Sequence, residues 1–289
     1  MIKKFILYIS CKTIFVIEKL SLLIARKSIL AWHKDYLESL SYKKIKILNF
    51  EINFFIPNNL VEWRVNTFYD KEPETLEWID SFDKKNDFIF WDIGANIGLY
   101  SIYNSLRNKN SKTVAFEPST SNLRVLSRNI SINNLEKRIK IFTPPLTDKE
   151  NKFLMMKESV FQEGGAFNSF GESFDFEGKT FTPQMNYKIF GTNINFLIEN
   201  KILDIPDYIK IDVDGIEHLI LEGSNKYLKD KKIKSISVEI NENFTDQLKR
   251  ILVVMEKNDF KIRHKKHSEM FNNNSNSKLS KIYNYIFER

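Results

Sequence analysis

The sequence predicts an α/β protein in which helices cover both faces of a mostly parallel sheet. From residue 88 onward, short apolar segments typical of buried strands alternate with amphipathic segments of helical length. A glycine-bearing turn follows the first of these strands, and acidic residues follow later ones. Such alternation indicates parallel strands, because each intervening helix returns the chain to the same end of the sheet.

The expected elements follow one another in a regular order. Strands are recognised by short apolar runs, and helices by apolar residues three or four positions apart. We expect strands at 88–94, 113–118, 139–146, 208–215 and 233–240. We expect helices at 72–82, 98–106, 120–134, 216–228 and 245–259. Ser119 or Thr120 is a suitable cap for the helix that follows it. The last two segments, 260–265 and 282–289, are expected to form a terminal antiparallel pair.

Other segments interrupt or precede this alternation. Residues 45–56 alternate well enough for a strand or hairpin, and 151–185, rich in glycine, phenylalanine and polar residues, suggest a hairpin-like insertion. The asparagine-rich tract 271–280 is expected to be a surface loop. We therefore expect an N-terminal part, 1–60, made of a helical extension and leading strands, and one sheet domain over 61–289.

The first thirty residues resemble a signal peptide or membrane anchor, because lysines precede a largely apolar stretch. However, Lys12, Glu18 and Lys19 interrupt that stretch, which does not suit a spanning helix of about 20 apolar residues. An amphipathic helix fits better. We expect it to pack on the main domain or on a partner subunit of an oligomer, with peripheral contact to a membrane surface as the alternative.

Composition limits the class of protein. The chain has 289 residues and a net charge of +7, with its basic residues spread along its length. A solvated surface is the simplest interpretation, and attraction to an anionic substrate or membrane is the alternative. The single cysteine, Cys11, excludes an intramolecular disulfide framework and a cysteine-rich zinc site. A cytoplasmic protein is expected, with membrane association as the alternative.

The turn after the first strand, "DIGANIG" at 92–98, departs from the phosphate-binding pattern G-x-G-x-x-G. Asn96 replaces the middle glycine, and the carboxylate of Asp92 would repel a diphosphate but attract an ammonium group. Glu117 ends the second strand, where such sheets place an acid against ribose hydroxyls. Together the two acids favour a nucleoside with an amino-acid tail, S-adenosylmethionine. Either acid alone is as well explained as a helix cap or a surface carboxylate.

Three segments, "FWDIGANIGLYS", "VAFEPS" and "YIKIDVDGIEHLILEG", resemble in their order and spacing the motifs of the FkbM family of S-adenosylmethionine-dependent methyltransferases. The resemblance extends from about residue 60 to 289. It implies a Rossmann-like class I methyltransferase fold, with a mostly parallel seven-stranded sheet whose last strand is antiparallel. It also implies methyl transfer to an oxygen, often on a sugar or a secondary metabolite.

Carried over to this sequence, the resemblance assigns the methionine-binding turn to Asp92, Gly94, Ala95, Asn96 and Gly98. It assigns the ribose to Glu117. Asn122 is expected to help orient that segment, with a helix-surface amide as an equal alternative. Asp148 matches the place where such proteins approach the adenine amino group, with a simple turn residue as the alternative. Asn195 stands where the family usually has an acid, which puts an acid role there in doubt.

The chemistry requires the acceptor oxygen, the methyl carbon and the sulfur to lie in line, and the hydroxyl proton to be removed. If the fourth strand continues through Asp214, Asp212 and Asp214 face the same side. Independently of that condition, Asp212 is expected nearest the methyl group and the acceptor, with His218 or Glu217 as the base. First-turn acids are also stabilised by the helix dipole alone, and a lone histidine is more often a packing or surface residue.

Two further acid roles remain open. The acids after the fourth strand could hold Mg²⁺ against a diol substrate, because carboxylates suit hard cations, although no metal is expected. Glu239, which ends the fifth strand, is expected to face the cleft as a substrate contact or a structural acid.

The sequence thus predicts a methyltransferase that acts on a hydroxyl of a sugar, glycolipid or secondary metabolite, with a small-molecule or glycan acceptor and no nucleic acid. "TPPL" at 143–146 faintly resembles a loop of methyltransferases acting on nucleic-acid bases, but it lacks a stacking aromatic. The alternatives are an NAD-dependent oxidoreductase on a related fold and a nucleic-acid or membrane-surface binder with a vestigial cofactor site. Acceptor specificity is expected to lie in 151–190 and the N-terminal region.

Overall fold

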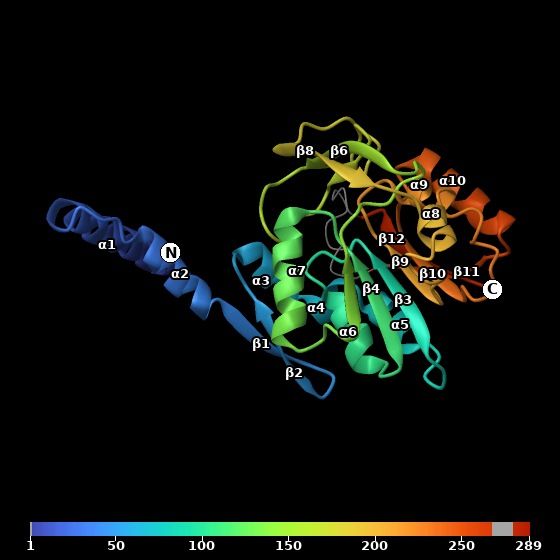
Figure 1. The fold of residues 1–289 in the computed structure, drawn as a ribbon, viewed down its shortest axis with the longest axis horizontal. Coiled ribbons are helices and arrows are strands. Elements are labelled where there is room, and N and C mark those ends of the chain that lie inside the picture. The colour runs from blue at the N-terminus through green and yellow to red at the C-terminus, as the bar shows by residue number, and fades with distance from the viewer. Residues whose placement is uncertain (1, 268–279) are drawn as a thin grey trace. The chain divides into compact units, whose positions relative to one another are not determined.

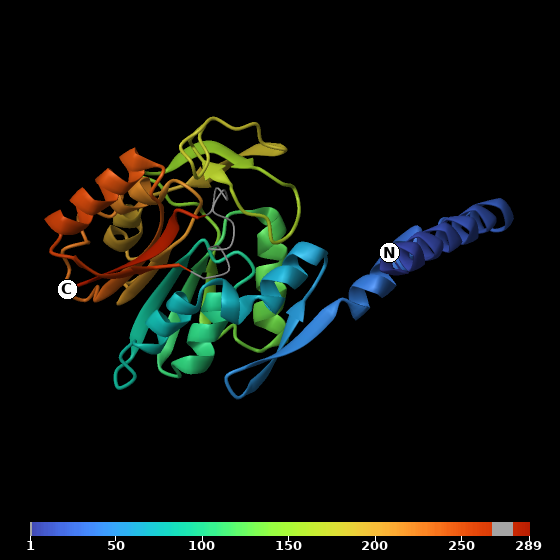
Figure 2. The ribbon, with the colours of Figure 1, turned by 180° about the vertical axis from the view of Figure 1, so that it is seen from behind.

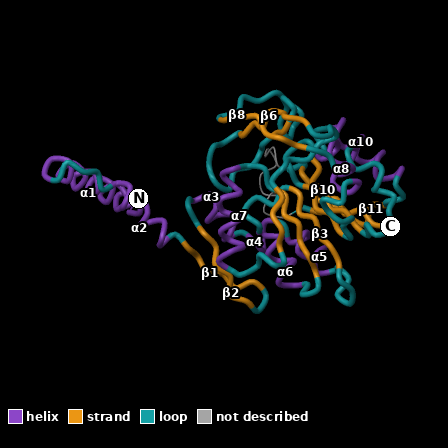
Figure 3. The backbone as a smooth tube through the Cα atoms, in the orientation of Figure 1, coloured by secondary structure: helices purple, strands orange, loops and turns teal. Residues whose placement is uncertain are grey.

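The computed structural model describes residues 2–267 and 280–289, so the tract expected as a surface loop lies, but for residue 280, outside the described residues. The chain forms two compact units, Met1–Lys43 and Lys44–Arg289. The smaller unit contains two helices, α1 (Ile2–Ile24) and α2 (Leu30–Leu40) (Figure 3). Among the described residues, no helix is both long and apolar enough to cross a membrane.

The larger unit is built on a seven-stranded sheet with the order β11-β12-β10-β9-β3-β4-β5 (Figure 1). Its strands are β3 (Phe88–Ile93), β4 (Ser111–Phe116), β5 (Ile139–Phe142), β9 (Tyr208–Ile211), β10 (Ser235–Asn241), β11 (Lys261–Lys266) and β12 (Ile282–Glu288). β12 runs antiparallel to both of its neighbours, and the other adjacent strands are parallel. The predicted mostly parallel sheet with an antiparallel last strand is confirmed. The strand order reverses between β3 and β9, which is the point where ligands bind such sheets.

Helices cover both faces of this sheet (Figure 1 and, from behind, Figure 2). Along β3, Phe88 and Phe90 pack into one core and Trp91 and Ile93 into the other, because successive side chains of a strand point to opposite faces. The first core includes residues of α3 (Asn59–Asn66), α4 (Phe68–Lys71), α5 (Pro73–Asp80), α6 (Leu99–Arg107) and α7 (Thr120–Ile132). The second includes residues of α8 (Ile194–Glu199), α9 (Glu217–Glu222) and α10 (Thr245–Lys257).

Polar caps fix where three of these helices begin. The side chains of Asn58, Ser119 and Asn193 accept the first-turn N–H groups of α3, α7 and α8. An N-terminal turn has no helical partners for these donors, so each cap satisfies a group that would otherwise be unpaired. The predicted cap at Ser119 is confirmed, and Pro73 stands at the start of α5 as expected.

Two smaller sheets accompany the main one. β1 (Tyr42–Ile47) and β2 (Phe50–Phe55) form a hairpin, and the Phe55 N–H donates to the Asn129 side chain on α7 at 2.9 Å. The inserted region forms a three-stranded antiparallel sheet of order β7-β6-β8, from β6 (Lys152–Glu158), β7 (Ser169–Phe170) and β8 (Met185–Gly191). It therefore has one strand more than a hairpin and extends past residue 185.

The region after the fourth parallel strand differs from the expectation. β9 ends at Ile211, so the prediction that the strand continues through Asp214 is wrong. Asp214 has a φ of +64° and Gly215 a φ of +127°, conformations that turn the chain out of an extended path. α9 is correspondingly short, six residues from Glu217 to Glu222, rather than the expected 216–228.

Candidate active site

A cavity of about 450 Å³ lies where β3, β4, β9 and β10 end. Each strand end contributes to its lining, through Gly94, Glu117, Asp212 and Glu239, and the inserted region contributes Gly165. Its volume is in the range of small-molecule sites, about 300–1,000 Å³. Because the cavity coincides with the reversal of strand order, it is the candidate active site.

Gly94 allows the turn after β3 to approach the turn after β9. Its φ is +88°, and a Cβ atom there would lie 1.8 Å from the carbonyl oxygen of Asp212. The Gly94 and Ala95 N–H groups donate to the Phe116 carbonyl at 3.0 and 2.9 Å, which ties the turn to the end of β4. Gly98, with a φ of +89°, begins α6. Gly94 thus makes room for the close approach, and the polar side chain that the turn contributes to the cavity lining is that of Asn96.

Asn96 is the polar centre of this turn. Its N–H donates to Glu117 Oε2 at 2.8 Å, and its Nδ2 donates to the Gly165 carbonyl at 2.8 Å. Its Oδ1 is buried and has no hydrogen-bond partner in the described chain. A buried acceptor without a partner is costly, so this oxygen is suited to a ligand donor in the cavity.

Glu117 lies at the end of β4, where the sequence predicts a ribose-binding acid. It is 5% exposed, and its two oxygens accept the N–H groups of Asn96 and Ser119, each at 2.8 Å. Burial raises the pKa of Glu117 to about 8, although these hydrogen bonds favour its charged form. Each carboxylate oxygen can accept more than one hydrogen bond, so the two oxygens of Glu117 can still accept hydrogen bonds from two ligand hydroxyls.

Asn122, on α7, ties the inserted region to the turn after β3. It is buried, its Oδ1 accepts the Gly164 N–H at 2.8 Å, and its Nδ2 donates to the Gly165 carbonyl at 3.1 Å. Because Asn96 donates to the same carbonyl, the Gly164–Gly165 pair is fastened at the edge of the cavity. The Asn122 side chain is therefore buried and hydrogen-bonded to the inserted region. It is not an exposed amide on the helix surface, which was the alternative.

Asp92 lies beneath the turn rather than in the cavity lining. It is fully buried, its Oδ2 accepts the Ser101 hydroxyl at 2.6 Å, and its Oδ1 has no partner in the described chain. Burial raises the pKa of Asp92, while the nearby Lys210 opposes that shift.

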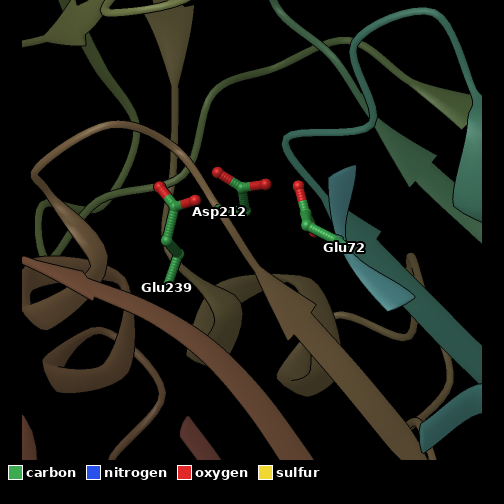
Figure 4. A group of neighbouring side chains, drawn as sticks. All are labelled: Glu72, Asp212 and Glu239. Atoms are coloured by element: carbon green, nitrogen blue, oxygen red, sulfur yellow. The ribbon is translucent and has the colours of Figure 1, made fainter. Parts of the chain in front are cut away.

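Three carboxylates converge at the floor of the cavity (Figure 4). One oxygen each of Glu72, Asp212 and Glu239 lie within 4.8 Å of one another. The buried Lys210 Nζ is 2.6 Å from Asp212 Oδ2 and 3.8 Å from Glu72 Oε2, and the Lys71 Nζ is 2.7 Å from Glu72 Oε1. Two ammonium groups thus offset much of the negative charge of this acid cluster.

The pKa values within the acid cluster diverge. Burial would raise the pKa of Glu72, but Lys71 and Lys210 lower it to about 2. Burial raises the pKa of Glu239 well above its usual value, and repulsion from Asp212 and Glu72 adds to that shift. Burial opposes the charge on Lys210, yet the neighbouring carboxylates raise its pKa. Such divergent acids in one cavity are typical of functional sites.

Glu217 and His218 do not line the cavity. Glu217 accepts two backbone N–H groups of the preceding turn and the Gln247 side chain, the latter at 2.6 Å. His218 is 1% exposed and packs beside Phe174 and Phe244, with ring centroids 6.3 and 5.9 Å away. Burial lowers the pKa of His218 to about 4. The structure thus brings Asp212 to the cavity without either of the residues expected to act as its base.

Asp148 also lies outside the cavity lining. Its side chain is exposed and its Oδ1 accepts the Thr147 hydroxyl at 2.9 Å, which matches the turn-residue alternative. The end of β5 instead contributes Pro144, Pro145 and Leu146 to the lining.

Sequence reasoning missed Glu72 and Lys210. Lys210 had a visible signal, a charged residue within the otherwise apolar strand "YIKI". A buried lysine is rare unless it is paired, so it indicates nearby acids. Glu72 has no such signal, because it belongs to a helix start far from the strands in sequence.

Three features together define a class I methyltransferase. They are the Rossmann-like sheet with its antiparallel last strand, the cavity at the switch point and the acid at the end of the second strand. A family model described as the Methyltransferase FkbM domain matches residues 92–262, more than half of the chain. The chain belongs to the FkbM methyltransferase family, and S-adenosylmethionine is its cofactor. The cavity fits this cofactor, because Asn96 Oδ1 and the Glu117 carboxylate offer buried acceptors at the turn.

The chain is also similar to several solved methyltransferases. Precorrin-6y C5,15-methyltransferase from Geobacter metallireducens GS-15 is 14% identical, with 75% of this chain and 86% of that chain covered and a TM-score of 0.43. A putative tRNA methyltransferase from Streptococcus pneumoniae, in complex with S-adenosyl-L-methionine, is 14% identical, with 74% and 72% covered and a TM-score of 0.42. A putative rRNA methylase from Clostridium thermocellum is 10% identical, with 75% and 93% covered and a TM-score of 0.45. No curated protein matches the chain significantly.

Proposed function

We propose that this methyltransferase methylates a hydroxyl oxygen of a small polar acceptor, such as a sugar, a glycolipid head group or a secondary metabolite. The observation that carries the proposal is the pair of carboxylates, Asp212 and Glu239, that meet in the cavity. An alcohol must lose its proton as the new bond forms, whereas an already nucleophilic amine has less need of a base.

Glu239 is the proposed base. A catalytic base works best when its pKa is close to the operating pH, and the pKa of Glu239 is raised. Glu239 replaces His218 and Glu217 in this role, since neither lines the cavity. Asp212 also lines the cavity, and we propose that it lies nearest the methyl group and the acceptor and orients the hydroxyl through a hydrogen bond.

The proposed reaction balances without a further reactant. Bound S-adenosylmethionine supplies an activated methyl group. Asp212 would hold the acceptor oxygen in line with that methyl carbon, so that the carbon–oxygen bond could form as the carbon–sulfur bond breaks and S-adenosylhomocysteine leaves. The proton of the acceptor hydroxyl passes to a carboxylate oxygen of Glu239 and then to solvent. Aligning the reacting atoms accounts for much of the catalysis in such a reaction.

The cofactor contacts are proposed on the geometry of the turn. Glu117 would accept the ribose hydroxyls and Asn96 a donor of the methionine part, while Gly94 and Ala95 leave room for the chain of the ligand. Asp92 would act from beneath the turn, through its charge, rather than as a lining residue.

A nucleic-acid acceptor is not favoured by charge. Of the net charge of +7, residues 44–289 carry only +2, so the unit that holds the cavity lacks the strong basic field of most nucleic-acid-binding domains. The absence of nucleic acid among the acceptors stays a prediction.

The experiment that tests the function has two parts. Isothermal titration of the full chain with S-adenosylhomocysteine should detect binding that Glu117→Ala weakens and Asp148→Asn, outside the cavity, leaves unchanged. The purified protein should be incubated with cell extract and methyl-labelled S-adenosylmethionine. The label that the protein transfers should appear in a glycan, lipid or small-molecule fraction as a methyl ether. Label found in RNA, or on nitrogen or carbon, would overturn the proposal of an oxygen acceptor.

A further inference from the structure

The smaller unit displays apolar side chains that a folded helix pair would be expected to cover. On α1, the apolar side chains of Ile2, Ile9, Val16 and Leu23 are all exposed, by 77%, 48%, 54% and 78%. On α2, Trp32 is 71% exposed. Contiguous exposed apolar surface of this kind marks an interaction site.

Four of the exposed apolar residues of α1 form a continuous stripe, and others, among them Phe5 and Leu20, widen the apolar surface around it. Ile2, Ile9, Val16 and Leu23 repeat every seven residues, which places them along one side of an α-helix. Lys12 and Lys19, which are also seven residues apart, lie on a second stripe roughly a sixth of a turn away, whereas Lys4 lies almost opposite Ile2. The Lys12 and Lys19 ammonium groups lie over the rings of Tyr8 and Phe15, at 5.5 and 4.7 Å. The lysine stems therefore follow the helix surface beside the apolar stripe, as they do where charged heads stay in water above an apolar layer.

The charge of the chain is concentrated in this unit. Residues 1–43 contain eight lysines and arginines against three acidic residues, a net charge of +5 out of the chain's +7. Glu18, the one acid on α1, is 6% exposed and accepts the Ile29 N–H at 2.9 Å, where α2 begins. Its carboxylate thus fixes the connection between the helices instead of offsetting the lysines at the surface.

These observations select one occupant for the apolar stripe. A second copy of the same unit would bring another charge of +5 against the first, which opposes association. An anionic lipid surface is complementary to both stripes at once, since it offers acyl chains beneath a layer of negative head groups. In the described chain no helix is able to span a membrane, so α1 would lie within the interface.

We propose that the unit Met1–Lys43 docks on an anionic lipid surface, with the apolar stripe of α1 inserted below the head groups and Lys12 and Lys19 against them. Trp32 adds an aromatic ring of the kind enriched at membrane interfaces. The docking site lies entirely within this unit and is independent of the cavity.

The test is co-sedimentation of the full chain with vesicles. Vesicles of phosphatidylcholine with phosphatidylglycerol should retain the protein, pure phosphatidylcholine should retain much less, and binding should weaken as salt is added. The double variant Lys12→Glu/Lys19→Glu should bind at least about tenfold less tightly, because each basic residue near an anionic surface contributes about a fivefold factor. The matched control Lys137→Glu/Lys140→Glu, two exposed lysines of the larger unit, should bind as the unchanged chain does.

Two further variants separate the outcomes. Val16→Asp should abolish sedimentation with vesicles while S-adenosylhomocysteine binding persists. Trp32→Phe should still sediment but lose a blue shift of tryptophan fluorescence on vesicle addition. Equal binding to both vesicle types would overturn the proposal. So would equal loss in the Lys137→Glu/Lys140→Glu control, or a lipid-free dimer that Val16→Asp dissociates, which would make a second copy the occupant.

Discussion

The ammonium of Lys210 lies 2.6 Å from the carboxylate of Asp212, at the bottom of the candidate active-site cavity. Lys210 is 1% exposed, so its charge is compensated by the protein rather than by water. The pair therefore links the stability of the carboxyl end of β9 to the charge of the candidate active site.

Replacing Lys210 tests that link. Lys210→Met should lower the free energy of unfolding by about 3–5 kcal/mol, because it leaves buried acids without their partner. Denaturant unfolding would measure this change. Lys226→Met, which removes an exposed ion pair with Glu199, should leave the unfolding midpoint nearly unchanged. Equal effects in the two variants would show that the buried pair has no special role.

The raised pKa of Glu239 predicts the pH dependence of the reaction. A base must be unprotonated to act, so activity should fall as the pH drops through the raised pKa of Glu239. In a profile of kcat/KM against pH, the fall in activity on the acidic side should occur at a pH above the ordinary pKa of a carboxylate. Glu239→Gln should remove most activity. Glu72→Gln should move this fall in activity to lower pH, because Glu72 helps to raise the pKa of Glu239. If the fall stays at the same pH in Glu72→Gln, Glu239 is not the base.

Glu117 should make the cofactor-free protein less stable as the pH rises. Its folded pKa of about 8 lies above the ordinary value of 4.5, so the folded state binds more protons across that interval. Stability is then lost between about pH 4.5 and pH 8. Thermal unfolding at about pH 6 and pH 8 should show a smaller decline in Glu117→Gln than in the unchanged chain. An identical decline would mean that burial does not perturb this carboxyl.

Gly94 and Gly98 allow a controlled comparison, because their φ angles are nearly equal at +88° and +89°. Alanine at either position carries about 1–2 kcal/mol of backbone strain. At Gly94 the new Cβ would also meet the Asp212 carbonyl at 1.8 Å, whereas at Gly98 it meets the end of the Leu126 side chain at 2.6 Å. Gly94→Ala should therefore lose S-adenosylhomocysteine binding and destabilise more than Gly98→Ala. The reverse order in calorimetry would contradict this account of the turn.

The acid cluster should work without a divalent metal, since Lys71 and Lys210 already lie against Glu72 and Asp212. Methyl transfer should be unchanged when EDTA is added, and unchanged again when Mg²⁺ is supplied in excess. A loss of activity in EDTA that Mg²⁺ restores would show that the carboxylates bind a metal with the acceptor.

Much of the fold follows from local patterns. Each parallel strand appears in the sequence as a short apolar run, and the carboxyl ends of parallel strands meet at one edge. The strand pattern alone therefore places Glu117, Asp212 and Glu239 at the edge where the cavity lies. The antiparallel last pair, β11 and β12, is also visible locally, because both strands lie close together at the end of the chain.

The placement of Glu217 and His218 could not be predicted in this way. Their direction depends on where β9 stops, and the positive φ of Asp214 rotates the following helix so that both side chains lie outside the cavity lining. A one-residue change in the end of a strand reverses which side its next residue faces.

The sequence by itself determined the class of sheet, the glycine-bearing turn after β3 and the acids at the strand ends, because each depends on neighbouring residues and on the periodicity of strands and helices. Only the tertiary structure decided that Glu72 and Lys210 meet Asp212, and that Asn96 and Asn122 hold the same carbonyl of Gly165. These contacts join segments far apart in the chain. They depend on how whole elements pack against one another, and a local pattern does not contain that information.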